Sequence, residues 1–207
     1  MLSFFRKSKK RNPKKGMAFY HRENLIQTID ELNLTLSRID SIDIINTDKQ
    51  ITFQDNRLDS ITIKSLEDIF GEESYILEPE SAIVGHKVYY YRLTAEHFRF
   101  LIQVHFINDE FFFIGNKIYT ELPITINDKR KIIDQLTSKY IPDAKLNTIE
   151  FAIKDTDGNL VYTIDNIYYY LKYIANNTTS RRLKKEYAHY VKPEAGVEIK
   201  ETLDKMI

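Results

Sequence analysis

The spacing of apolar residues changes along the chain, and each change predicts a different kind of element. Between Phe19 and Ile39 apolar residues recur every three or four positions, as on one face of an amphipathic helix. From Asp40 to Ile63 apolar and polar residues alternate instead, with turn-forming residues between the runs. That period is typical of β-strands. Short strands are expected at 42–44, 51–53 and 58–63.

The middle of the chain carries the clearest strand pattern. A short helix is expected first, between Ser65, a favourable N-cap residue, and Gly71, a favourable helix stop. Three runs rich in aromatic and β-branched residues follow it, separated by polar turns: 87–93, 98–107 and 111–120. Runs of this length and composition favour strands over helices. We therefore predict a central three-stranded antiparallel meander.

The next segment predicts a helix and then a hairpin. Asn127 or Asp128 is expected to cap a helix that ends at Tyr140. The dipeptide Asp157-Gly158 strongly favours a tight turn between two strands, at 148–154 and 160–164. The stretch Asp155-Thr156-Asp157-Gly158 resembles a calcium-binding loop, but the glycine stands at the wrong position, so a hairpin turn is expected.

Two closing helices are expected over 165–175 and 180–191, and they complete the fold prediction. The chain is expected to be an α+β protein with an N-terminal amphipathic helix and a central antiparallel meander. Its helices should pack on one face of the sheet and at the C-terminus. The predicted organisation is a flexible basic arm (1–16), a single α+β domain (17–192) and a charged C-terminal tail (193–207).

Charge separates the arm from the rest of the chain. The arm holds seven basic residues and no acidic ones: Arg6, Lys7, Lys9, Lys10, Arg11, Lys14 and Lys15. The whole chain has 30 basic and 30 acidic residues, so residues 16–207 hold 23 basic against 30 acidic, a net charge of −7. A basic arm on an acidic body is typical of an interaction tail. Its expected partner is a nucleic acid, an anionic membrane surface or an acidic protein surface; a purely solubilising arm is the alternative.

Composition removes several classes of function. With no cysteine, the chain cannot form disulfides, thiolate nucleophiles or iron–sulfur sites. Its six glycines form neither a dinucleotide-binding nor a phosphate-binding loop, and the histidines follow no metal-ligand spacing. No run of 18 apolar residues predicts a transmembrane segment. We expect no metal and no cofactor, and a location in the cytoplasm or inside a larger assembly.

One face of the predicted strand 98–107 offers a candidate polar site. Because side chains alternate along a strand, Arg99, Gln103 and His105 share one face. His86 and Arg92 on the preceding strand are expected beside them. Such a face could bind an anionic or polar ligand, and it is the place to look for an active site if the protein is an enzyme. A solvated outer face of a one-sided sheet is the more common arrangement.

Two tyrosine triplets offer candidate protein-binding surfaces, at 89–91 and 168–170. Exposed tyrosines are enriched in protein interfaces and can also stack on bases. The expected contact residues are Tyr89, Tyr91, Tyr169 and Tyr170. Together these features predict a non-catalytic protein-interaction or assembly module. The alternatives are a nucleic-acid or membrane binder that uses the arm, and an enzyme with a site near His105.

Overall fold

The computed structural model describes residues 15–37, 42–79 and 83–187. Nearly all of the predicted arm and the whole predicted tail therefore lie outside the described residues. The described helices are α1 (Met17–Glu23), α2 (Ile29–Ser37), η3 (Leu58–Ser60), α3 (Leu66–Phe70), α4 (Ile126–Tyr140) and α5 (Thr178–Tyr187). The described strands are β1 (Ile44–Asn46), β2 (Thr52–Phe53), β3 (Asn56–Arg57), β4 (Tyr75–Leu77), β5 (His86–Ala95), β6 (Phe98–Ile107), β7 (Glu110–Tyr119), β8 (Ala152–Lys154), β9 (Leu160–Asp165) and β10 (Tyr169–Ile174).

A single eight-stranded sheet forms the centre of the molecule, in the order β1-β8-β9-β10-β7-β6-β5-β4. Two antiparallel meanders build it, one from β4 to β7 and one from β8 to β10. The meanders join where β10 pairs antiparallel with β7, and α4 lies in the connection between them. β1 adds the only parallel pairing among the described strands, alongside β8. The α+β class and the central meander are confirmed.

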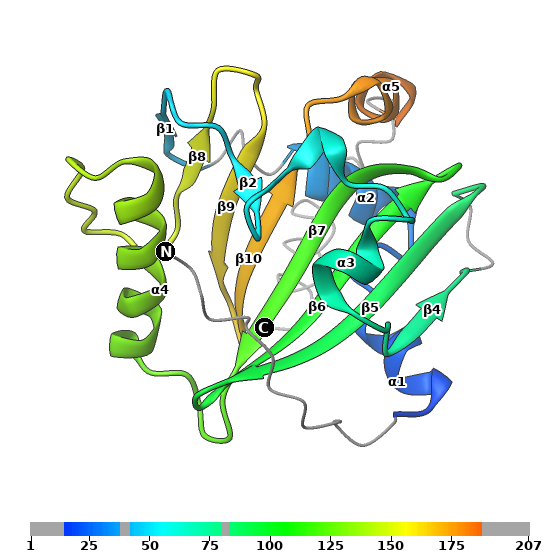
Figure 1. The fold of residues 1–207 in the computed structure, drawn as a ribbon, viewed down its shortest axis with the longest axis horizontal. Helices are drawn as coiled ribbons and strands as arrows, with labels where there is room; N and C mark the ends of the chain where they lie inside the picture. The colour runs from blue at the N-terminus through cyan, green and yellow to red at the C-terminus, as the bar shows by residue number, and fades with distance from the viewer. Residues whose placement is uncertain (1–14, 38–41, 80–82, 188–207) are drawn as a thin grey trace, which may run out of the picture.

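Helices cover both faces of this sheet, where the sequence predicted one (Figure 1). We call the face that packs against α3, α4 and the small β2–β3 hairpin the α4 face. The opposite face, covered by α1, α2 and α5, is the α1 face. Along β6, Phe100, Ile102 and Val104 belong to the core of the α4 face, whereas Leu101 and Ile107 belong to the α1 face. The predicted alternation of side chains along this strand is confirmed.

The predicted helix over 19–39 is wrong, because α1 and α2 are separate helices. Asn24 ends the first: its backbone is extended, and its side-chain oxygen accepts a hydrogen bond from the Ile26 N–H. Thr28 begins the second through a capping box with Glu31, in which each side chain accepts a hydrogen bond from the other residue's backbone N–H. Two local polar contacts therefore interrupt an otherwise continuous apolar stripe.

The predicted helix over 165–175 is also wrong, because residues 169–174 form β10. This strand pairs along its whole length with β9 on one side and β7 on the other. Tyr169, Leu171 and Tyr173 are buried on the α4 face, a period of two that fits a strand. Aromatic and β-branched residues favour a strand with neighbours on both sides. The segment 58–63, predicted as a strand, instead contains the short helix η3.

Two predicted helix starts shift by a few residues. α4 begins at Ile126 rather than after Asn127 or Asp128, because Thr125 is its N-cap and shares a capping box with Asp128. α5 begins at Thr178 rather than Ser180, and the predicted end at 191 lies outside the described residues. The end of α4 at Tyr140, the helix stop at Gly71 and the hairpin between β8 and β9 are confirmed.

Candidate functional site

Four of the eight predicted contact residues that the structure describes lie inside the protein. Tyr91, Gln103, His105 and Tyr169 have at most 2% of their surface exposed. Tyr89 and Tyr170 are half-buried, and Arg99 is exposed, where it pairs with Glu121. Of the arm residues only Lys15 is described, and it is exposed. Arg6, Lys7, Lys9, Lys10, Arg11 and Lys14 lie outside the described residues. The expectation of a solvated outer sheet face is wrong, because the segment from α1 to α2 covers it.

Gln103 fastens that covering segment to the α1 face. Its side-chain amide donates to the backbone oxygen of Glu23 at 2.6 Å and accepts from the Leu25 N–H at 3.0 Å. Lys117 on β7 lies next to it and pairs with the Glu23 carboxylate at 2.7 Å. Gly115 on β7 faces the same covering segment, and a Cβ at this position would collide with the Leu25 side chain. Gln103 and Lys117 therefore act as structural ties between the sheet and the segment after α1.

His105 forms a buried pair with His86, the residue expected beside it on the preceding strand. Nε2 of His86 lies 3.0 Å from Nδ1 of His105, and the rings stack beside Phe112 and Phe113. Burial lowers the pKa of His86 to about 4. Burial, with His86 and Lys172 nearby, lowers the pKa of His105 well below its ordinary value. Both rings are therefore neutral at pH 7, and the pair is packed in apolar core without contact with solvent.

The α4 face contains the candidate site, a pocket of about 340 Å³ between the sheet, α4 and the β2–β3 hairpin. Its walls are mostly apolar, with side chains from β2, β6, β7, α4 and β10: Phe53, Phe98, Phe100, Ile118, Ile132, Leu136, Leu171 and Tyr173. Its polar lining residues are Thr52, Gln54, Glu96, Asn116, Lys131, Gln135 and Lys139. This size and this balance of lining are typical of small-molecule sites.

The alternation along β7 places Asn116 in the wall of this pocket. Ile114 and Ile118, two positions to either side, belong to the apolar core of the same face. Asn116 has 2% of its surface exposed, and its Oδ1 has no hydrogen-bond partner among the described residues. A buried polar atom without a partner costs about 1–3 kcal/mol, and such atoms in native proteins call for an explanation. A ligand in the pocket would supply one.

The hairpin wall of the pocket is held in place by hydrogen bonds from α4. The Tyr140 hydroxyl donates to the Thr52 backbone oxygen at 2.8 Å and accepts from the Thr52 N–H at 3.2 Å, as a neighbouring strand would. Lys139 donates to the Thr52 hydroxyl at 2.9 Å and lies 3.6 Å from the Asp55 carboxylate. These contacts position the short hairpin although it pairs with no strand of the main sheet.

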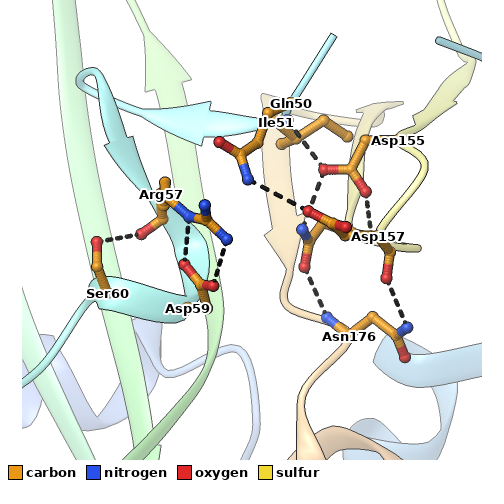
Figure 2. Close-up of polar contacts among 9 residues, drawn as sticks. Gln50, Ile51, Arg57, Asp59, Ser60, Asp155, Asp157 and Asn176 are labelled. Carbon is orange, nitrogen blue, oxygen red and sulfur yellow. Dashed lines mark hydrogen bonds and ion pairs between the residues drawn. The ribbon is translucent and has the colours of Figure 1, made fainter. Parts of the chain in front are cut away.

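A second set of contacts fixes the chain just before the hairpin (Figure 2). The buried Asp155 carboxylate accepts from the Ile51 N–H at 3.0 Å and from the backbone and side chain of Asn159. Gln50 donates to Asp157 at 3.2 Å. The predicted turn at 155–159 thus does more than reverse the chain, because it anchors the segment that leads into the pocket wall.

Sequence reasoning missed Asn116, Gln54 and the pocket itself. A signal for Asn116 was present, because it is the polar member of an inward-facing series in the predicted strand 111–120. No comparable signal marks Gln54, whose position in the pocket depends on contacts between distant segments. Among the described residues no group of three or more histidine, aspartate or glutamate side chains could hold a metal ion. No helix in the described ranges has the length and apolar composition needed to cross a membrane.

Comparison of the chain with protein-family models, with curated proteins and with solved structures finds no match.

Proposed function

We propose that this protein is a non-catalytic binding module and that the pocket beside α4 is its binding site. The observation that carries the proposal is the unpaired Oδ1 of Asn116 in the wall of an otherwise mostly apolar cavity. Apolar walls provide affinity through burial of ligand surface, and a few placed polar groups provide orientation. The lining therefore offers the means of holding a small molecule.

The proposal moves the expected interaction from the tyrosine-rich surfaces to the pocket. Tyr91 and Tyr169 are too deeply buried to contact a partner without unfolding. Tyr173 on β10 lines the pocket, although the sequence did not mark it as a contact residue. Tyr91 and Tyr169 belong to the core of the α4 face, and Tyr170 lies against the core of the α1 face.

A blocking variant on α4 tests this proposal. Gln135 is exposed and lines the pocket, whereas its neighbour Asp134 is exposed and does not. Gln135→Trp should place a bulky ring over the cavity, and Asp134→Trp adds the same ring elsewhere on the helix. With the neutral fluorescent probe N-phenyl-1-naphthylamine, we expect enhanced emission for wild type and Asp134→Trp and a loss of at least about 10-fold in affinity for Gln135→Trp. Equal binding by all three proteins would contradict the proposal.

A second proposed role belongs to the basic arm, because seven basic residues precede a body of net charge −7. We propose that it attaches the protein to an anionic partner in the cytoplasm or within a larger assembly. Nucleic acid, an anionic membrane and an acidic protein surface share this chemistry. Binding to duplex DNA and to phosphatidylserine vesicles should be measured over a range of salt, with and without residues 1–15. Contact with seven nucleic-acid phosphates predicts a log–log salt slope of about −6. If binding is unchanged after deletion of residues 1–15, the arm does not bind the anionic partner.

A further inference from the structure

We infer that the pocket selects a neutral ligand with an apolar body and an amide, or another group that presents an N–H donor beside an acceptor. This inference rests on the proposed function and adds the chemical class of the ligand. It follows from two unpaired side-chain atoms that line the same cavity from different walls: Oδ1 of Asn116 on the sheet and Nε2 of Gln54 on the hairpin. One can only accept a hydrogen bond and the other can only donate one.

The neighbours of Asn116 explain why no side chain beside it on the sheet satisfies its oxygen. Its cross-strand partners are Ile102 on β6 and Leu171 on β10, whose side chains have no donor. The residues two positions along β7 on the same face are Ile114 and Ile118. The sheet surrounds the amide with hydrocarbon on four sides, so the cavity is the direction from which a donor can approach.

Gln54 is held at the cavity by the geometry of its turn. Gln54 and Asp55 both have positive φ angles, 47° and 64°, as in the two-residue turn that joins twisted strands. The Asn56 side chain donates to the Gln54 backbone oxygen at 2.9 Å and closes the turn. A non-glycine residue in this conformation is uncommon, and it costs energy that the surrounding contacts must offset. The turn presents the Gln54 amide group to the pocket rather than leaving it in solvent.

The charges around the cavity favour a neutral ligand over a carboxylate. A carboxylate has no donor for Asn116 Oδ1, and its negative charge would lie against that oxygen. Of the charged lining residues, Lys139 already contacts Thr52 and Asp55, and the exposed Glu96 and Lys131 have opposite charges. A neutral amide offers a group of the right kind to each unpaired atom, because an N–H can donate to Asn116 and a carbonyl can accept from Gln54. The aromatic walls formed by Phe53, Phe98 and Phe100 then cover its apolar part.

A matched pair of probes tests the inference. N-benzylacetamide and benzyl acetate have nearly the same shape, but the ester has an oxygen where the amide has its N–H. We expect wild-type protein to bind the amide about 10-fold more tightly than the ester, measured by NMR titration. In Asn116→Leu the two affinities should differ by less than about 2-fold, because the acceptor is gone. Gln135→Trp should weaken both probes, and Asp134→Trp neither.

The outcomes separate the inference from the proposed function. Equal affinities of wild type for the two probes, both reduced in Gln135→Trp, would overturn the amide preference and leave the pocket as a binding site. Failure of wild type to bind either probe would overturn both. If Asn116→Leu keeps the full preference for the amide, another group accepts the hydrogen bond from the N–H of the probe. That result also overturns the inference. The wild-type ratio does not depend on whether Asn116→Leu folds.

Discussion

The buried polar residues on the two faces of the sheet differ in their pairing and in what surrounds them. On the α1 face Gln103 and Lys117 each have a partner on another segment, whereas His86 and His105 pair with each other and leave Nδ1 of His86 and Nε2 of His105 without a partner. On the α4 face Asn116 is as deeply buried, yet its oxygen has no partner and borders a cavity. Burial of a polar group therefore does not by itself mark a function. What distinguishes Asn116 is that its unpaired oxygen borders a cavity, whereas the unpaired histidine nitrogens of the α1 face lie in packed apolar core.

The largest expected effect belongs to Lys117. Its side chain is 9% exposed, its partner Glu23 is 17% exposed, and its ammonium lies 3.6 Å from the centre of the Tyr168 ring. Lys117→Met would leave the Glu23 carboxylate in a poorly solvated place without its counter-ion. Because removing one member of a buried pair is strongly destabilising, we expect the free energy of unfolding to fall by about 3 kcal/mol. Urea denaturation at pH 7 measures it.

A double variant shows whether this loss comes from the unpaired carboxylate. In Glu23→Leu/Lys117→Met both charges are absent, so most of the lost stability should return. If the double variant is as unstable as Lys117→Met alone, the ion pair is not the cause. The packing of the lysine stem against Tyr168 would then explain the loss.

The histidine pair should make the α1 face sensitive to acid. His86 has a pKa of about 4 in the folded protein, below its ordinary value near 6.5, so below pH 6.5 the unfolded chain binds more protons than the folded one. Stability therefore falls as the pH is lowered from 6.5 towards 4. From pH 7 to pH 5 His86 alone should reduce the free energy of unfolding by about 2 kcal/mol. The pKa of His105 is lowered as well, so this residue adds to the loss of stability in acid.

Removing both imidazoles tests this pH dependence. His86→Leu/His105→Leu should lose less stability between pH 7 and pH 5 than wild type does, whatever its stability at pH 7. His21→Gln, at an exposed position outside the pair, should behave as wild type. An unchanged pH dependence in the double variant would mean that the acid sensitivity arises elsewhere.

The sequence predicted the centre of the fold because its signals there are local. Aromatic and β-branched alternation defines β5, β6 and β7, and Asp157-Gly158 defines the hairpin between β8 and β9. The prediction of a helix over 165–175 was wrong because β10 is stabilised by pairing with β9 on one side and β7 on the other. The periodicity of residues 165–175 does not by itself show these pairings. The division into α1 and α2 was readable, since Thr28 and Glu31 have the spacing of a capping box.

The candidate site was harder to predict because it combines distant segments. The pocket joins the β2–β3 hairpin, the β5–β6 turn, α4 and three strands of the main sheet. No local sequence pattern predicts the hydrogen bond between Tyr140 and Thr52 or the one between Asp155 and Ile51. The sequence did place Gln103 and His105 together on one face, but it could not show that α1 and the link after it cover that face. Coverage is a tertiary property, and it decides between a binding surface and a core.

Gln103 provides a smaller test of the α1 face. Gln103→Leu would leave the Glu23 carbonyl and the Leu25 N–H without their partner. Each unsatisfied backbone group has a cost, and water can reach part of this link, so we expect a loss of about 1–3 kcal/mol in the free energy of unfolding. Hydrogen exchange of the Leu25 amide should accelerate as well. A variant with unchanged stability and exchange would remove Gln103 from the set of structural ties.

Asn116→Leu is the matched substitution on the α4 face, and it should have the smallest effect with the opposite sign. The change removes an oxygen that has no partner and adds hydrocarbon to a site with free volume beside it. Loss of an unsatisfied polar group and gain of apolar contact both favour the folded state. We expect the free energy of unfolding to stay unchanged or rise by up to about 1 kcal/mol. Urea denaturation of Asn116→Leu beside Gln103→Leu measures the contrast directly. A loss for Asn116→Leu equal to that for Gln103→Leu would mean that Asn116 is satisfied in the folded protein. The asymmetry between the faces, and with it the reason to look for a ligand, would then disappear.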